Sequence, residues 1–421
     1  MDSKFQLYSK ILEKPSLRFN YALPNSIDKN LRRGLINSGP YDSNLFPKSR
    51  IKAAVIFHLL QENNVIRFEN AMKNGLGIFK GFSKTFRTNI DFVDFKATDF
   101  SKKSYDFCLN QVIKNNYDLC YVIFDTIDSK IYSLVKTRLL GNGIPCQVIN
   151  HNKINIPDDQ LQWIIENIAL ASYAKVGGTP WVIHAVEDKP EIVIGVSRAM
   201  DRSRKVIVGF TTVFKHNGDF ILFHSKSPII GWEKYEEGLG VLIREAIEEY
   251  TKREKTPKSV VFHFHKNPGR EINVIKKELE GLDIEYALLH LNSFSNFKLF
   301  DTTHKTCTPL AGLEVNLSRN SALLLSDGRS ETGTRPYLGV PSVLEITMNK
   351  SSTMDLGEFP RLIKQIYDFA HINWRGFNAK TIPVTINYSY LIARLIGNLE
   401  SIEAWNAIIA NGKLVDKAWF L

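Results

Sequence analysis

The sequence is poor in cysteine and has no long apolar run. Its four cysteines, Cys108, Cys120, Cys146 and Cys307, form no C-x-x-C pair, which argues against a zinc site or a thioredoxin-like centre. No apolar stretch reaches the roughly 18 residues that a membrane span needs. The first residues, MDSKFQLYSK, contain no apolar signal region. We therefore expect a cytoplasmic protein with free thiols.

Acidic residues are outnumbered by basic ones. The chain of 421 residues has 54 Lys and Arg against 44 Asp and Glu, a net charge of +10. Such an excess on a folded protein suggests an anionic partner, most commonly a nucleic acid, although many basic proteins bind none. Hydrophobic residues make up 44% and charged residues 23%, which is typical of a folded protein. The length suits two domains better than one core.

The first half of the chain alternates strands and helices. Residues 1–50 contain four prolines and little periodicity, which indicates a wrapping segment with short strands. After them the pattern predicts strands at 51–60, 118–126 and 144–150, and helices at 65–79, 104–116, 131–143 and 158–178. This alternation favours an α/β fold, a Rossmann-like domain with a mostly parallel sheet.

The second half follows a different order. Strands are expected at 191–199, 204–214 and 219–225, and His216-Asn217-Gly218 between the last two is a strong hairpin signal. A helix (235–254), a strand (259–265), a helix (271–282) and a strand (286–292) follow, then strands near ALLLS and SVLEITM. Helices are expected at 358–374 and 388–400. Three antiparallel strands followed by an αβαβ run match the order of an RNase H-like fold.

Several short motifs resemble short prokaryotic Argonautes, in the order in which that family carries them. They are LRRGLINSGPYD (31–42), IYSLVKTRLLGNGIPCQVI (131–149), AKVGGTPW (174–181), IVIGVSRA (192–199), NWRGF (373–377), IPVTINY (382–388) and AWFL (418–421). The resemblance implies a wrapping segment (1–50), a MID domain (51–170) that binds a guide 5′ end, and a PIWI domain (171–421). It leaves no room for N and PAZ domains.

The resemblance also implies a pocket for the guide 5′-phosphate. Tyr132 would stack on the first base, and Lys136, on the same helix face at i+4, would contact the phosphate. Gln147 and Lys175 would complete the pocket, and Asn167, two turns before Lys175, would contact the second or third phosphate. Taken singly, each residue has an ordinary structural explanation. Their order as a set favours the pocket.

Two more features follow from the same resemblance. The carboxylate of Leu421, the last residue of the sequence, would hold a Mg²⁺ ion together with Gln147, because oxygen ligands beside phosphate suit this ion. Arg375 is expected to contact the guide backbone, with a structural role for the arginine equally open. Further candidates for the nucleic-acid channel are Lys205, Lys215, Arg335 and Lys380.

The residues at the expected cleavage site do not fit a two-metal centre, which needs carboxylates around two Mg²⁺ ions. By the same resemblance, Ser197 stands where active members of the family carry the first aspartate, and Pro268 where they carry the second. NYSYLIA (387–393) supplies no acidic or histidine ligand, and Asp201 falls beyond the strand end. His263 and His265 are expected to be hydrogen-bonded strand histidines and not metal ligands. We predict no catalytic residue.

The resemblance, together with the missing carboxylates, therefore implies a binding protein and not an enzyme. It would load a short guide, RNA or DNA, and recognise a complementary target strand without cutting it. The resemblance implies a separate partner with an APAZ-type region and an effector domain, in defence against viruses or plasmids. Two alternatives stay open: an RNase H-like nuclease with non-standard metal ligands, and a Rossmann-like protein that binds a small ligand.

Overall fold

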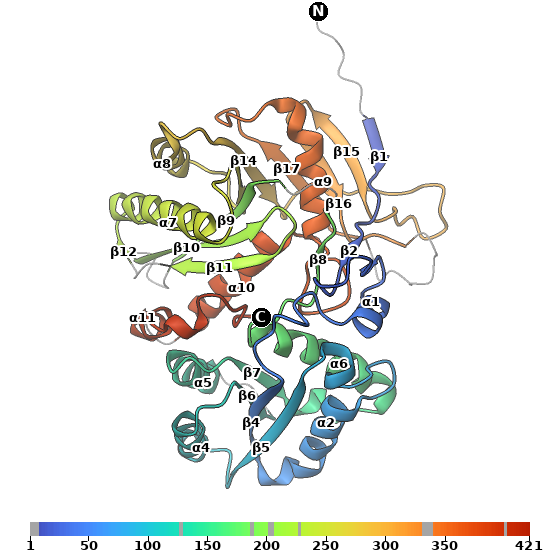
Figure 1. Ribbon diagram of the computed structural model, residues 1–421, viewed down its shortest axis with the longest axis vertical. Helices are drawn as coiled ribbons and strands as arrows, with labels where there is room; N and C mark the ends of the chain where they lie inside the picture. Colours follow the sequence, from blue (N-terminus) through green and yellow to red (C-terminus); the bar gives the residue numbers. More distant parts are fainter. Residues whose placement is uncertain are drawn as a thin grey trace, which may run out of the picture.

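A computed structural model describes residues 8–125, 129–185, 189–200, 206–225, 229–330, 340–399 and 402–421. The elements form two lobes, one above the other, with the end of the chain between them (Figure 1). We call β4–β7 with α2–α6 the small lobe, and the larger sheet with α7–α11 the large lobe. No helix of the described residues is long and apolar enough to cross a membrane.

The small lobe is built on a parallel sheet with strand order β5-β4-β6-β7. Its strands are β4 (Arg50–His58), β5 (Asn89–Ala97), β6 (Leu119–Phe124) and β7 (Cys146–Asn150). Every residue of β6 is buried, as expected for a central strand covered on both faces. The predicted Rossmann-like parallel sheet is thereby confirmed.

Helices cover both faces of this sheet. They are α2 (Glu62–Asn74), α3 (Phe82–Phe86), α4 (Lys102–Lys114), α5 (Ser129–Gly141) and α6 (Asp158–Lys175), with 3-10 turns η1 (Leu59–Gln61) and η2 (His151–Lys153). Asp158 and Asp159 lie in the first turn of α6, where carboxylates interact favourably with the helix dipole. Gly177 follows the helix with φ +100°, a conformation that favours glycine, so α6 ends where the K-V-G-G sequence begins.

The large lobe contains a mixed sheet with strand order β1-β15-β16-β17-β14-β13-β9-β10-β11, and β12 also pairs with β10. Its strands are β1 (Tyr8–Ile11), β9 (Glu191–Met200), β10 (Val206–Lys215), β11 (Phe220–Ser225), β12 (Ile229–Ile230), β13 (Ser259–Phe264), β14 (Glu285–Asn292), β15 (Leu313–Ser318), β16 (Ser321–Leu325) and β17 (Leu344–Met348). The β10–β11 turn contains Gly218 at φ +78°, as the hairpin signal predicts.

Two pairs of helices sandwich this sheet. α7 (Trp232–Arg253) and α8 (Arg270–Leu279) share a core with β9, β11, β13 and β14. α9 (Phe359–Phe369) and α10 (Val384–Asn398) cover the opposite face, where Gly195 leaves room for the backbone of α10. The antiparallel β9–β10–β11 group and the parallel β9–β13–β14 pairs form an RNase H-like arrangement, as the sequence predicted.

The N-terminal segment contacts the large lobe in short pieces. β1 pairs with β15, and β2 (Leu17–Arg18) lies between β3 (Ile27–Asp28) and β8 (Val182–Ile183) in a separate small sheet. α1 (Leu31–Ser38) begins after Asn30, whose side chain accepts from the backbone N–H of Arg33.

Some elements differ from their predicted positions. α2 runs from 62 to 74 and not from 65 to 79, because the chain turns at Gly75 with φ +97°. α9 ends at Phe369, five residues before the predicted end, and Trp374 is buried in the loop that follows. Pattern reading did not find β5, β15 or α11 (Ile402–Ile409). The 3-10 turns η3 (Leu356–Glu358) and η4 (Gly412–Leu414) complete the described elements.

Candidate nucleic-acid interface

The first half of the candidate pocket lies on α5. Tyr132 is half-buried and Lys136 is almost fully buried, one helical turn further on. The Lys136 Nζ lies 5.7 Å from the centroid of the Tyr132 ring and donates a hydrogen bond of 3.1 Å to the carbonyl of Cys146 at the start of β7. Gln147 follows directly, with its side-chain Nε2 3.4 Å from the carbonyl of Val148. Lys136 therefore contacts the residue that precedes Gln147, where α5 packs on β7.

Lys175, in the last turn of α6, reaches the end of the chain. Its side chain is fully buried, and its Nζ donates to the carbonyls of Trp419 and Leu421. The carbonyl of Trp419 lies 3.2 Å away. Lys175 and Leu421, two residues of the expected pocket, are therefore in direct contact.

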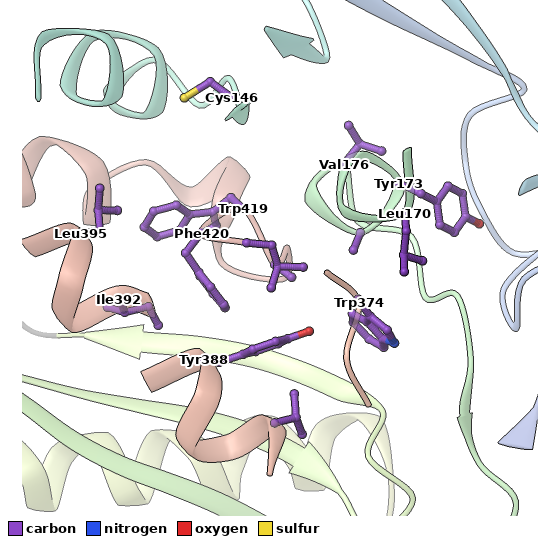
Figure 2. Packing of buried hydrophobic residues seen from close by; sticks show 14 of the residues in the cluster. Cys146, Leu170, Tyr173, Val176, Trp374, Tyr388, Ile392, Leu395, Trp419 and Phe420 are labelled. Carbon is purple, nitrogen blue, oxygen red and sulfur yellow. The ribbon is translucent and has the colours of Figure 1, made fainter. Parts of the chain in front are cut away.

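The final residues are held by aromatic packing. Figure 2 shows Trp419 and Phe420 between Tyr388 on α10 and the segment around Cys146 and Val176. The Phe420 ring lies 5.0 Å from that of Tyr388, edge to face. Burying these large side chains contributes about 1.5–3 kcal/mol each. This packing places Leu421 at the junction of the two lobes.

Two more predicted residues lie beside the same junction. Arg375 is exposed, on the loop after α9. Asn167 is exposed on α6, and its Oδ1 lies 3.3 Å from the position that a Cβ on Gly376 would take. The Asn167 side chain is thus next to the residue that follows Arg375. The sequence had placed these two residues on the guide backbone for different reasons, and the fold brings them together.

Arg394, on α10, is a residue that the sequence reading missed. It is exposed, and its charge acts on Arg375. The stretch 387–393 had been searched only for acidic or histidine metal ligands. Arg394 directly follows this stretch on the same helix, and a basic residue at this position was the sequence signal for a further contact to an anion.

The local electrostatics point to an anion. Burial lowers the pKa of Lys175 well below its usual value, and the charges of Lys136 and Arg375 lower it further. Partial desolvation of its guanidinium and the charge of Arg394 both lower the pKa of Arg375. No ion pair with an acidic side chain involves any of these four cations in the part of the chain that the structure describes. Repulsion of this kind is relieved by a group that brings negative charge, such as a phosphate.

The other basic candidates are not part of this cluster. Lys215 forms ion pairs with Asp219 (3.6 Å) and Glu254 on the hairpin side of the large lobe. Lys380 is exposed. Lys205 and Arg335 lie outside the described residues.

The part of β9 around Ser197 is a second region of interest. Ser197 is half-buried and lines a cavity of about 40 Å³ together with Arg198, His265, Lys266 and Glu271, among others. No group of three His, Cys, Asp or Glu side chains that could hold a metal ion occurs among the described residues. Asp201 lies outside them. Pro268 belongs to the turn between β13 and α8.

Glu271 is the one carboxylate that lines this cavity within the described chain, and sequence reading missed it. It is buried and forms an ion pair with Arg198. Its oxygens also accept from the Tyr235 hydroxyl at 3.2 Å and from the backbone N–H of Gly269 at 3.1 Å. A carboxylate engaged by a guanidinium and two further donors has little capacity left for Mg²⁺.

The strand histidines match their prediction only in part. Nδ1 of His263 lies 2.7 Å from the Thr385 hydroxyl, and burial lowers the pKa of His263 to about 3, so its ring stays neutral at physiological pH. Nε2 of His263 and Nδ1 of His265 are buried without a hydrogen-bond partner in the described structure. The expected hydrogen bond is therefore present for the His263 ring, whereas Nδ1 of His265 has no partner among the described residues.

A parallel-sheet lobe and an RNase H-like lobe that meet at a cluster of four cations define a class of nucleic-acid-binding proteins. The Piwi domain model matches residues 119–400, from β6 in the small lobe to the end of α10. The chain belongs to the Piwi domain family.

Relatives of this family match along most of the chain. The chain is 26% identical to an Argonaute protein of Cereibacter sphaeroides, over 92% of this chain and 56% of that one. It is 24% identical to a Piwi protein of Archaeoglobus fulgidus, over 95% and 96% of the two chains. The structure resembles Clostridium butyricum Argonaute bound to a guide DNA and a target DNA, with a TM-score of 0.73, 17% identity, and coverage of 93% and 53%. The chain thus spans little more than half the length of the first and third of these proteins.

Proposed function

We propose that this chain holds a short guide nucleic acid, RNA or DNA, by its 5′-phosphorylated end and recognises a complementary target without cutting it. The observation that carries the proposal is the cluster of Lys136, Lys175, Arg375 and Arg394 at the lobe junction. None of these cations forms an ion pair with an acidic side chain of the described structure, and Lys175 contacts Leu421. A terminal phosphate carries up to two negative charges and suits such a cluster. Tyr132, half-buried beside Lys136, offers a ring for the first base.

The domain boundaries are part of the same proposal. Residues 51–170 act as the MID domain and 171–421 as the PIWI domain, with 1–50 as the wrapping segment. The small lobe ends at Lys175, close to the proposed boundary. The pairing of β1 with β15 supports a wrapping role for the first segment.

The residues fit the proposed Mg²⁺ ion. Among the residues that the structure describes, only the amide nitrogen of Gln147 is engaged, with the Val148 carbonyl, so Oε1 is an available oxygen ligand. Leu421 would supply its carboxylate, and the phosphate would supply further oxygens, which is the ligand chemistry that Mg²⁺ prefers. The ion would neutralise phosphate charge. Lys175 already donates to Leu421, so it would orient this carboxylate.

The proposal that the chain does not cut rests on two residues and one ion pair. Ser197 and Pro268 stand where metal-binding carboxylates are needed, and Glu271 is held by Arg198. If the guide-loaded protein does not cleave its target, another polypeptide must produce the effect that follows target recognition. An APAZ-type effector partner and a role in prokaryotic defence against viruses or plasmids complete the proposal.

The experiment compares guides with and without a 5′-phosphate. Lys136→Ala combined with Lys175→Ala should weaken binding of 5′-phosphorylated oligonucleotides by about 100-fold or more, because each charge-assisted hydrogen bond contributes about 1.5–3 kcal/mol. Binding of 5′-hydroxyl oligonucleotides should change much less. Fluorescence anisotropy with RNA and DNA guides measures both constants.

The matched control is Lys276→Ala with Lys277→Ala, which removes the same charge from the exposed side of α8. Because Lys175 is buried, Arg375→Ala serves as a second variant that removes an exposed side chain. Equal losses for phosphorylated and hydroxyl guides would rule out the phosphate pocket. Phosphate discrimination as strong in both pocket variants as in the native protein would rule it out as well.

A nuclease with non-standard ligands is the competing function. Glu271 beside Ser197 is the feature that favours it. Incubation of the guide-loaded protein with a matched target and Mg²⁺ or Mn²⁺ separates the two. Cleavage at one fixed position that Glu271→Gln abolishes would establish the nuclease, and an intact target supports recognition alone.

A further inference from the structure

A second built feature lies on α6, away from the phosphate pocket. The guanidinium of Arg32, from α1, contacts two aromatic rings, 5.2 Å from the centroid of Trp163 and 4.7 Å from that of Phe377. These three side chains come from three separate segments of the chain. We call them the Trp163 platform.

A buried carboxylate fixes the Arg32 guanidinium of the platform. Nε and Nη2 of Arg32 each donate at 2.7 Å to the carboxylate of Glu166, which is buried. Nη1 of Arg32 makes no hydrogen bond within the described structure. A guanidinium held by two bonds and two rings loses little further freedom on binding, which favours recognition of an anion by its remaining edge.

Part of the platform is exposed to solvent. Trp163 is 47% exposed although its ring rests on Arg32, and the Arg32 side chain is 37% exposed. An indole of this exposure presents a large apolar surface that water solvates poorly. Stacking of a nucleobase covers such a surface irrespective of base identity. An Arg edge beside an aromatic face is therefore a chemistry that fits a nucleotide: base on ring, phosphate on guanidinium.

The position of the platform along α6 fits one strand. Trp163 precedes Asn167 by one turn and Lys175 by three turns, so the rise from Lys175 to Trp163 is about 18 Å. A strand advances about 3.4 Å per nucleotide when stacked and more when extended, so this rise corresponds to about three to five nucleotides. Asn167 and the exposed Arg375 lie between the two ends.

We propose that the Trp163 platform is a nucleotide subsite for the guide strand, about three to five nucleotides from the 5′-phosphate. This inference rests on the proposed function, because it needs a guide anchored at Lys136 and Lys175. One base of the unpaired guide stacks on Trp163, and its phosphate accepts from Nη1 of Arg32. The subsite sets how the strand leaves the pocket along α6.

The test uses 5′-phosphorylated DNA and RNA oligonucleotides in which one base at a time is removed. With the native protein, an abasic nucleotide at one position in this window should weaken binding by about tenfold, within the range for base–aromatic stacking. Trp163→Ala should lose the same factor with the complete guide and then show no abasic effect at that position. Trp163→Phe should keep most of the effect, because it retains a ring.

The control is Phe107→Ala, which removes an aromatic side chain of similar exposure (64%) from α4 in the same lobe. It should leave the abasic pattern unchanged. A native protein that prefers 5′-phosphate but shows a flat abasic scan would overturn the platform and leave the proposed function standing. A native protein indifferent to the 5′-phosphate would instead refute the proposed function. An identical abasic profile in Trp163→Ala and the native protein would also overturn the platform.

Discussion

At the scale of the residue, Arg394 is a cation of the large lobe that contributes charge to the proposed pocket. It is exposed on α10, in the large lobe, while Lys136 belongs to the small lobe. Its charge acts on Arg375. The cations that surround a guide end would therefore come from both lobes, and the affinity for the guide depends on their mutual placement.

Arg394→Ala should lower the affinity for 5′-phosphorylated guides by a few fold, because exposed charges contribute about 0.2–1 kcal/mol. It should also reduce the slope of log affinity against log salt by about one unit, as expected for loss of one phosphate contact. A titration at several salt concentrations measures both. Lys277→Ala on α8 is the control, and an unchanged slope in Arg394→Ala would contradict a role for Arg394.

Single residues were predictable where a motif fixed them. Tyr132, Lys136, Gln147 and Lys175 belong to short ordered motifs, and the fold brings Lys136, Lys175 and the last residues together. Glu271 was missed because its importance depends on Arg198, which is far away in sequence and near in space. An ion pair across two elements leaves no pattern in a sequence.

At the scale of the element, α2 and β5 contain an unusual carboxylate pair. Burial raises the pKa of Glu69, on α2, to about 8. A hydrogen bond to Asp94 on β5 and the charge of Asp94 act in the same direction, and the charge of Lys73 opposes them only partly. An unfolded chain releases the Glu69 proton near pH 4.5, whereas the folded protein keeps it to about pH 8. The folded state then binds more protons, so this group makes the protein less stable as pH rises between these values.

Glu69→Gln should remove this fall in stability with rising pH. Relative to the native protein, the variant should gain about 1–2 kcal/mol in free energy of unfolding between pH 5 and pH 8, a figure reduced from the full shift to allow for solvent screening. Urea unfolding at the two pH values measures it. Glu62→Gln, which removes a carboxylate from an exposed ion pair on the same helix, is the control. The same pH dependence in both variants would disprove the assignment.

Elements were predictable where their period was clear. The buried strands β4 and β6 and the helices α4, α5 and α6 were found within a few residues. β5 (NIDFVDFKA) was missed because it is only partly buried and contains two aspartates, so it lacks the apolar run of a central parallel strand. β15 was missed for a related reason, since most of its residues are half-buried.

At the scale of the whole molecule, the end of the chain connects the lobes. Strand order could not be predicted, because β1 pairs with β15 about 300 residues later and such pairings leave no local signal. Of the junction, the sequence predicted only that its last residues, AWFL (418–421), take part in the pocket. The structure shows α11 and α10 of the large lobe against α5 of the small lobe, with Trp419 and Phe420 packed between them.

This arrangement makes the last residue the most sensitive point of the proposed pocket. An extension of a few residues after Leu421 should displace its carboxylate from Lys175 and abolish the preference for 5′-phosphorylated guides, because Lys175 would lose its orienting partner. Phe420→Ala, which keeps the carboxylate but removes packing against Tyr388, should lower the melting temperature and weaken phosphate discrimination only partly. The control is the same extension placed before Met1. Full phosphate discrimination in the extended protein would exclude the carboxylate from the pocket, while the cations at Lys136, Arg375 and Arg394 would still hold the guide.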